Sequence, residues 1–318
     1  MATYKSKQYL FVLLKLIVVF AALGVIVYKL KTQEGIIWAD FKSQLLGSSL
    51  FQIQTVLFVV LLSVFNWFFE MLKWQVLAKK IKNLSLFESA QQVLTAHTTS
   101  IFTPFKMGEY GAKTVFFDKK QSKKVLFLNF LGNMAQMTAT VFFGIIGGWF
   151  YVQQYFPEWS LSYLLLIIGA AVLLIIMISK ISLKSIKIST FSLAKIVDFV
   201  GSISPKNRFK IVGLSMLRYV TFSFQFAFLL SLLAPVSVFE VWPMVFSMYL
   251  LSSLLPVMQL FDFAIKGGVA VLIFAIIAPQ IVVSVTLLMW LLNAVFPALA
   301  GMGFVLSLNT KKLIKTAS

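Results

Sequence analysis

Two stretches of the chain place a carboxylate four residues before a lysine within otherwise hydrophobic sequence. The first pair is Glu109 and Lys113, and the second is Asp262 and Lys266. Side chains four residues apart share one face of a helix, and the acid-before-base order is the favoured one. An ionisable group inside a bilayer costs about 2.5–3.5 kcal/mol on insertion scales and usually marks a pathway or a binding site. The pattern therefore predicts an internal ion pair, a direct role in the passage of a substrate, or both.

Residues that break helices accompany each pair. Pro104 and Gly108 stand beside the first pair, and Pro256 and Gly267 stand beside the second. Proline removes a backbone donor and interrupts a helix, and glycine tolerates irregular backbone. Such backbone is tolerated at membrane depth only where it is buried in protein or lines a wet cavity. We therefore predict a helix, a break and a second helix around each pair.

The composition is that of a membrane protein. Of the 318 residues, 60% are hydrophobic and 12% are charged, and the mean hydropathy is +0.93. Soluble domains carry about 25% charged residues. We predict an all-α polytopic protein with a single membrane domain, 1–318, and no room for a soluble catalytic domain. Because there is no cysteine and a single histidine, disulfides and Cys/His metal clusters are excluded. We expect no enzyme activity, cofactor or metal site.

Apolar segments of the roughly 20 residues needed to cross a bilayer recur along the chain. The six predicted full spans are Leu10–Leu30, Leu50–Leu72, Val125–Val152, Leu161–Ser179, Ile211–Ala234 and Ile281–Leu308. Between them, Ser85–Phe117 and Val241–Ala278 are interrupted and are predicted to be re-entrant helical hairpins. The alternative is that each hairpin is a pair of short full spans, which leaves every loop on the same side.

The net charge of +18 orients these segments. Lysines flank the inward ends of the spans, and 180–210 is a basic linker, so the positive-inside rule places this linker and both termini in the cytoplasm. We expect the plasma membrane of a bacterium (its inner membrane). The basic face could also attract anionic lipid. Nucleic-acid binding is not expected, because the basic residues do not form one continuous face.

The two halves of the chain repeat the same order of elements with opposite orientation. Residues 1–152 form a first unit of two spans, a hairpin and a span, starting inside. Residues 161–308 form a second such unit, starting outside. Inverted-topology repeats of this kind build many transporters, with the binding site near the bilayer midplane.

Polar side chains recur at helical spacing in the spans beside the hairpins. The residues predicted to line a groove with the two ion pairs are Asn66, Glu70, Asn133, Gln136, Arg218, Gln225 and Asn293. Such side chains also simply hydrogen-bond between helices. The guanidinium fork of Arg218 suits a phosphate, although the residue could equally snorkel to the cytoplasmic surface. Lys73 follows Asn66 and Glu70 on the same helix face and is expected to leave the span on the cytoplasmic side.

The segment Thr103–Lys113 resembles the proline–glycine–glutamate motif of the lysylphosphatidylglycerol synthase/flippase transmembrane family, with Lys113 as the basic residue one turn after the glutamate. Pro256–Gly268 occupies the place of the second motif, but its glycines follow the acid. Asn293 stands near the place of a frequent family arginine. The resemblance implies lipid handling: in the best-known members the membrane module moves an aminoacylated lipid between leaflets. Aminoacyl transfer itself is not expected, because the soluble transferase domain is lacking.

These observations favour a lipid transporter or flippase-like protein that handles a polar or anionic phospho- or glycolipid headgroup, with membrane lipids as its partners. One alternative is a small-solute or ion-coupled secondary transporter. Another is a membrane-embedded transferase acting on a lipid-linked sugar, for which no acidic DxD-like pair is found. The last is an accessory scaffold in which the buried charges are structural.

Overall fold

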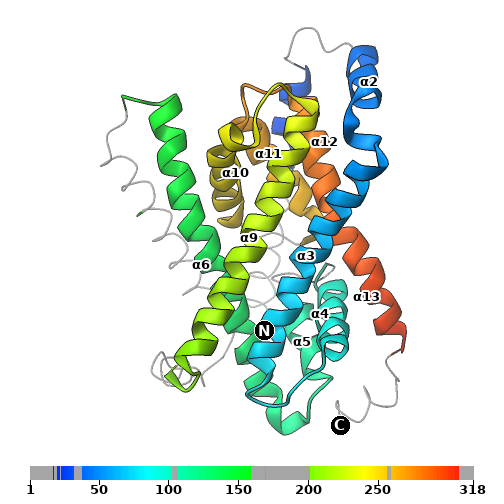
Figure 1. Ribbon diagram of the computed structural model, residues 1–318, viewed down its shortest axis with the longest axis vertical. Coiled ribbons are helices and arrows are strands. Elements are labelled where there is room, and N and C mark those ends of the chain that lie inside the picture. The colour runs from blue at the N-terminus through cyan, green and yellow to red at the C-terminus, as the bar shows by residue number, and fades with distance from the viewer. Residues whose placement is uncertain are drawn as a thin grey trace, which may run out of the picture.

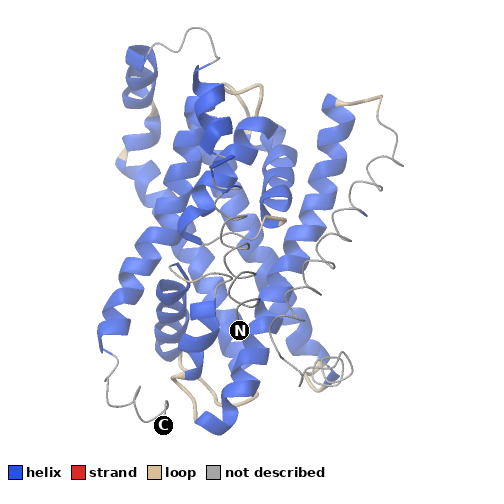
Figure 2. Cartoon of the chain, turned by 180° about the vertical axis from the view of Figure 1, so that it is seen from behind, coloured by secondary structure: helices blue, strands red, loops and turns tan. Residues whose placement is uncertain are grey.

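The structure is a computed structural model, and it describes residues 17, 20–21, 23–31, 38–101, 103, 107–158, 169, 201–255 and 259–307. Every regular element within these residues is a helix, and none of them is a strand (Figure 2). The predicted all-α class is confirmed.

Four helices are long and apolar enough to cross a membrane, by length and composition. They are α3 (Ile53–Ala78), Lys119–Tyr155, α9 (Pro205–Leu233) and Pro279–Ser307. The second consists of a 3-10 turn, η3 (Lys119–Gln121), and α6 (Ser122–Tyr155). The last consists of α12 (Pro279–Trp290), a π-helical turn, η5 (Leu291–Val295), and α13 (Phe296–Ser307). Even the shortest, with 26 residues, extends about 39 Å against a hydrocarbon thickness of about 30 Å.

These four helices coincide with four of the six predicted spans. The other two spans lie largely outside the described residues. Of Leu10–Leu30, residues 17, 20–21 and 23–30 are described, all as helical, and of Leu161–Ser179 only residue 169 is described. The basic linker 180–210 is described only from residue 201 onward, and its last residues already belong to α9.

Shorter helices occur where the two hairpins are predicted. The first set is α4 (Leu86–Ile101) and α5 (Met107–Thr114). The second is α10 (Val238–Ser253), the 3-10 turn η4 (Gln259–Phe261) and α11 (Asp262–Ile273). Figure 1 shows α4 and α5 in the lower half of the molecule and α10 and α11 in the upper half. A further short helix, α2 (Trp38–Gly47), and the 3-10 turn η1 (Ser49–Phe51) precede α3.

The first helix of each set begins with the same capping box. At α4 the backbone N–H of Glu88 donates to Ser85 Oγ (3.1 Å), and the N–H of Ser85 donates to Glu88 Oε2 (2.8 Å). At α10 the corresponding bonds between Ser237 and Glu240 measure 3.2 and 2.7 Å. Reciprocal bonds of this kind satisfy two orphan donors of the first helical turn. Both boxes read Ser-x-Phe-Glu, and Ser85 and Ser237 are separated by 152 positions, as are Pro104 and Pro256.

Helices of the two halves of the chain pack crosswise. From the first half, α4 packs against α13, α6 packs against α10, and α3 packs against α9. Each of these partners belongs to the second half. Glycines allow these close approaches: a Cβ at Gly301 of α13 would collide with the backbone oxygen of Leu94 on α4, and one at Gly147 of α6 would collide with Phe246 on α10. The two halves therefore form one interlocked bundle.

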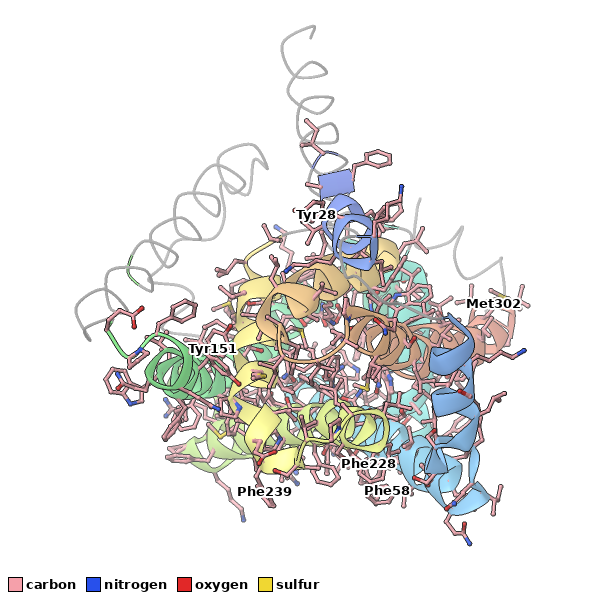
Figure 3. The ribbon with its side chains drawn as sticks, turned by 90° about the horizontal axis from the view of Figure 1, so that it is seen from above. Tyr28, Phe58, Tyr151, Phe228, Phe239 and Met302 are labelled. Carbon is pink, nitrogen blue, oxygen red and sulfur yellow. The ribbon has the colours of Figure 1, made fainter. Side chains whose placement is uncertain are left out.

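Polar and apolar side chains are distributed in the reverse of the usual soluble pattern. On α3, Leu57 and Val64 are exposed, whereas Asn66 and Glu70 are buried. Seen from above, the large side chains of Phe58, Phe239 and Met302 lie on the periphery of the bundle (Figure 3). The interior also contains large apolar clusters, but an apolar exterior together with buried polar and charged side chains is the arrangement of a membrane-embedded protein.

The glycines predicted to break the hairpins have different positions. Gly108 lies in the first turn of α5, where a Cβ would collide with the backbone oxygen of Thr99 on α4, so it permits the two helices to meet closely. The prediction for Gly267 is wrong: α11 continues through it and through Gly268 without interruption, because a glycine costs only about 1 kcal/mol relative to alanine in a helix and packing can offset that cost. Pro104 and Pro256 lie outside the described residues.

Candidate functional site

The two predicted ion pairs line one cavity of about 510 Å³. Its wall includes Glu109 and Lys113 of α5 together with Asp262 and Lys266 of α11. Side chains from α3, α4, α6, α9, α10 and the helix Pro279–Ser307 complete it. Segments about 150 residues apart in sequence thus contribute the same acid–base pattern to one internal space.

Most of the other predicted groove residues line the same cavity. They are Asn66, Glu70, Asn133, Gln136, Arg218 and Asn293. Gln225 does not line the cavity itself, but its Oε1 accepts a hydrogen bond from Asn293, which does. The structure therefore brings the predicted set together.

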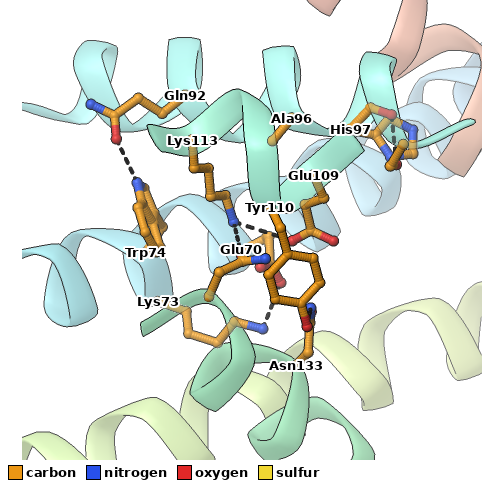
Figure 4. Close-up of polar contacts among 12 residues, drawn as sticks. Glu70, Lys73, Trp74, Gln92, Ala96, His97, Glu109, Tyr110, Lys113 and Asn133 are labelled. Carbon is orange, nitrogen blue, oxygen red and sulfur yellow. Dashed lines mark hydrogen bonds and ion pairs between the residues drawn. The ribbon is translucent and has the colours of Figure 1, made fainter. Parts of the chain in front are cut away.

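The pair on α5 is deeply held. Lys113 Nζ lies 3.2 Å from Glu109 Oε1 and donates to Asn129 Oδ1 at 2.5 Å, and its side chain is 3% exposed (Figure 4). Its ammonium also lies 4.3 Å from the ring centroid of Trp74, whose indole N–H donates to Gln92 Oε1. A charge buried with this many partners fixes α5 to α3, α4 and α6.

The pair on α11 is more open. Lys266 Nζ lies 2.5 Å from Asp262 Oδ2, and the two side chains are 33% and 31% exposed. Tyr249 of α10 provides a ring 5.5 Å from the ammonium. This pair is formed with the predicted four-residue spacing and remains accessible from the cavity.

Arg218 lies inside the bundle and does not snorkel. It donates from Nη1 to Glu70 Oε2 (2.6 Å) and from Nε to Asn66 Oδ1 (2.9 Å), so its fork joins α9 to two residues of α3. Asn66 and Arg218 are themselves 152 positions apart. The bond between them therefore joins two residues with the same sequence separation as Ser85 and Ser237.

A chain of amide hydrogen bonds continues from this junction. Asn66 Nδ2 donates to Asn293 Oδ1 (2.7 Å), and Asn293 Nδ2 donates to Gln225 Oε1 (2.9 Å). Gln225 Nε2 in turn donates to Ser63 Oγ (2.7 Å). Asn293 belongs to the π-helical turn η5, and such turns frequently occur at functional sites.

Lys73 was predicted to leave the bundle on the cytoplasmic side, and this prediction is wrong. The helix α3 continues to Ala78, so Lys73 is inside, only 1% exposed, with Nζ 2.7 Å from Glu70 Oε2 (Figure 4). Its position three residues after Glu70, on the same helix face, was the signal that could have identified it.

A second group missed by the sequence analysis connects the two sets of short helices. Ser100 Oγ of α4 donates to Gln259 Oε1 of η4 at 2.9 Å, and Gln259 Nε2 lies 3.3 Å from His97 Nδ1. His97 Nε2 lies 2.9 Å from the backbone oxygen of Ala294. Because a carbonyl only accepts, the bonding assigns the proton to Nε2 and leaves Nδ1 as acceptor. The two predicted hairpins therefore touch inside the cavity.

The polar stripe on α6 serves packing as well as the cavity. Asn133 Nδ2 donates to Tyr110 OH of α5 (3.3 Å), and Gln136 Nε2 reaches the backbone oxygen of Ser215 on α9 (3.5 Å). Both residues nevertheless line the cavity. Among the described residues, no group of three or more His, Asp or Glu side chains could hold a metal ion.

Comparison of the chain with protein-family models, with curated proteins and with solved structures gives no match. The fold and the cavity define a helical membrane protein with a charged internal site, and the resemblance of Thr103–Lys113 to the synthase/flippase family stays a prediction.

Proposed function

We propose that the protein moves a lipid with a polar or anionic headgroup between the leaflets of a membrane and performs no covalent chemistry. The observation that carries the proposal is the charged cavity, which lies inside a bundle whose exterior is apolar. Charges are retained in such surroundings mainly where they serve a pathway or a ligand.

The proposed architecture is the inverted repeat of units 1–152 and 161–308, with α4–α5 and α10–α11 as re-entrant hairpins from opposite sides. Three observations support it: the shared Ser-x-Phe-Glu caps, the crosswise packing, and the location of the two sets in opposite halves of the bundle (Figure 1). Six spans complete the proposed topology.

Alternating access follows from this architecture. Each hairpin packs against the last span of the other unit, and the hairpins meet at Gln259. A tilt of one unit against the other would separate a hairpin from that span and open the cavity on one side. Inverted-repeat transporters work largely by such rigid-body rocking around a fixed central site.

An apolar groove favours a lipid over a small solute. This groove, of about 260 Å³, lies on α3 and α12 and is lined by residues such as Val56, Val60 and Leu288. Val59 also lines it, and the backbone oxygen of Val59 accepts a bond from Gln225, which is linked to the cavity through Asn293. In the proposal the headgroup enters the cavity while an acyl chain stays in apolar surroundings of this kind.

The proposed orientation places the basic end of the bundle in the cytoplasm of a bacterium. Lys124 Nζ donates to the backbone oxygen of Lys80 (2.8 Å), and Lys80 contacts the backbone oxygen of Ser202. The lysine-rich segments after α3, before α6 and before α9 therefore gather at one end, as the positive-inside rule requires of a cytoplasmic face. Anionic lipid is the proposed partner of this face.

The test is leaflet movement of labelled lipids in proteoliposomes. Native protein should move anionic or aminoacylated phospholipids, and Lys266→Met should reduce the rate at least tenfold. The matched control is Lys82→Met, which removes a lysine from an exposed ion pair with Glu88 outside the cavity and should leave the rate unchanged. Both variants are compared at equal thermal stability.

Two results would overturn the proposal. One is the absence of movement for every lipid tested with well-folded native protein. The other is uptake of a water-soluble solute that depends on Lys266, which would establish the small-solute alternative.

A further inference from the structure

We infer that one half of the cavity, walled by α3, α5, α6 and α9, is a binding subsite for a singly charged oxyanion of the phosphodiester type. The inference deepens the proposed function by naming the group that would be recognised, and it rests on that function only for the lipid as the source of the oxyanion. A free phosphate is the other source of the same chemistry.

The charges of this half do not balance. Three cations, Lys73, Lys113 and Arg218, surround two carboxylates. Glu70 forms ion pairs with both Lys73 and Arg218, and Glu109 forms an ion pair with Lys113. The cluster therefore holds one positive charge more than its carboxylates offset. A buried charge without a partner is strongly unfavourable, and a single bound anion would complete the cluster.

Hydrogen-bond donors in the same place are unused. Within the described part of the chain, the indole Nε1 of Trp67 and the amide Nδ2 of Asn129 have no acceptor, and Lys73 Nζ has only its ion pair with Glu70. Trp67 lines the cavity and is 8% exposed, and Asn129 is buried. Buried donors are normally satisfied, because an unmade hydrogen bond costs about 1–3 kcal/mol.

The geometry of the donors suits oxygen atoms that carry charge. Arg218 lies over the Trp67 ring, 5.4 Å from its centroid, and both residues line the cavity, so the guanidinium and the indole are neighbours there. Planar guanidinium groups and N–H donors together bind phosphate and carboxylate oxygens with short, charge-assisted bonds.

The other half of the cavity lacks these features. Asp262 and Lys266 balance one another, and Gln259 is bonded to Ser100 and His97. Because of this difference, the anion would bind in the first half. The more open Asp262–Lys266 pair would contact the remainder of the headgroup.

The experiment is thermal unfolding of the purified full-length chain in detergent. Inorganic phosphate is titrated against sodium chloride at equal ionic strength, so that screening is the same in both series. We expect a saturable rise in Tm of at least about 3 °C with phosphate, since a ligand that binds only the folded state stabilises it. Dihexanoyl phosphatidylglycerol is compared with dihexanoyl glycerol, which lacks the phosphate.

Variants locate the effect. Lys73→Met removes the excess charge and should abolish the phosphate-induced shift. The double variant Glu70→Gln/Lys73→Met restores the excess and should retain the shift, and Lys82→Met should behave as the native protein. Trp67→Phe keeps an aromatic side chain but removes the N–H together with the five-membered part of the indole, and should weaken phosphate binding about tenfold or more. It tests the site even where Lys73→Met does not fold.

The outcomes separate this inference from the proposed function. Stabilisation by phosphate or phosphatidylglycerol that depends on Lys73 and Trp67 supports the subsite, even where leaflet movement fails. A response to the lipid alone identifies the lipid as the source. Equal shifts with chloride and phosphate, or unchanged shifts in both Lys73→Met and Trp67→Phe, overturn the subsite and leave leaflet movement to be judged by its own assay.

Discussion

The helices α5 and α11 carry the same acid–base pattern in two very different environments. Lys113 on α5 is almost fully enclosed and has three partners, namely Glu109, Asn129 and the Trp74 ring. Lys266 on α11 is one-third exposed and combines one ion pair with a more distant aromatic contact.

The difference teaches that equal sequence patterns can have unequal energetic roles. Removing one member of a buried pair leaves an uncompensated charge in low dielectric, whereas an accessible pair is partly solvated and contributes little to stability. Lys113 is therefore a structural anchor that also faces the cavity. Lys266, with one-third of its side chain exposed, is the more accessible of the two ammonium groups in the cavity.

The largest expected effect follows from the buried pair. Lys113→Met should lower the free energy of unfolding by about 3–5 kcal/mol, because Glu109 and Asn129 lose their common partner. Unfolding in denaturing detergent, followed by circular dichroism, measures the loss. The double variant Glu109→Gln/Lys113→Met should recover a large part of it. A single variant as stable as native protein would show that the two pairs do not differ as described.

One glycine from each of these helices, Gly108 of α5 and Gly267 of α11, sharpens the comparison with an intermediate effect. Gly108→Ala should cost about 1–3 kcal/mol, because the added Cβ collides with the Thr99 backbone and α5 must move away from α4. Gly267→Ala meets only the end of the Ile26 side chain at 3.1 Å, and alanine favours the helix, so its change should stay within about 1 kcal/mol. Equal costs, measured by the same unfolding assay, would contradict the assignment of Gly108 to close packing.

Local pattern was sufficient to predict much of this structure. The all-helical class follows from hydropathy, and the ion pairs follow from the four-residue spacing, because both depend on neighbours along one helix. The bounds of the four long helices agree with those of the predicted spans to within six residues at each end. Their polar faces also predicted which side chains would gather.

Tertiary packing determines the exposure and position of side chains that the local sequence pattern does not predict. Exposure separates Lys113 from Lys266, yet both have the same spacing to their acids. Lys73 follows an apolar span and has the pattern of a flanking lysine, but Arg218 and Glu70 of the bundle enclose it. Gly267 stays helical although Gly268 follows it, because it is packed inside the bundle, where Ile26 lies against it.

The smallest expected effect on stability belongs to the accessible pair. Lys266→Met should change the free energy of unfolding by no more than about 1 kcal/mol, because water entering the cavity solvates the remaining carboxylate of Asp262. Its stability is measured beside that of Lys113→Met, in the same detergent and at the same pH. A cost as large as that of Lys113→Met would make the Asp262–Lys266 pair a second structural anchor, and would contradict the difference drawn between the two pairs.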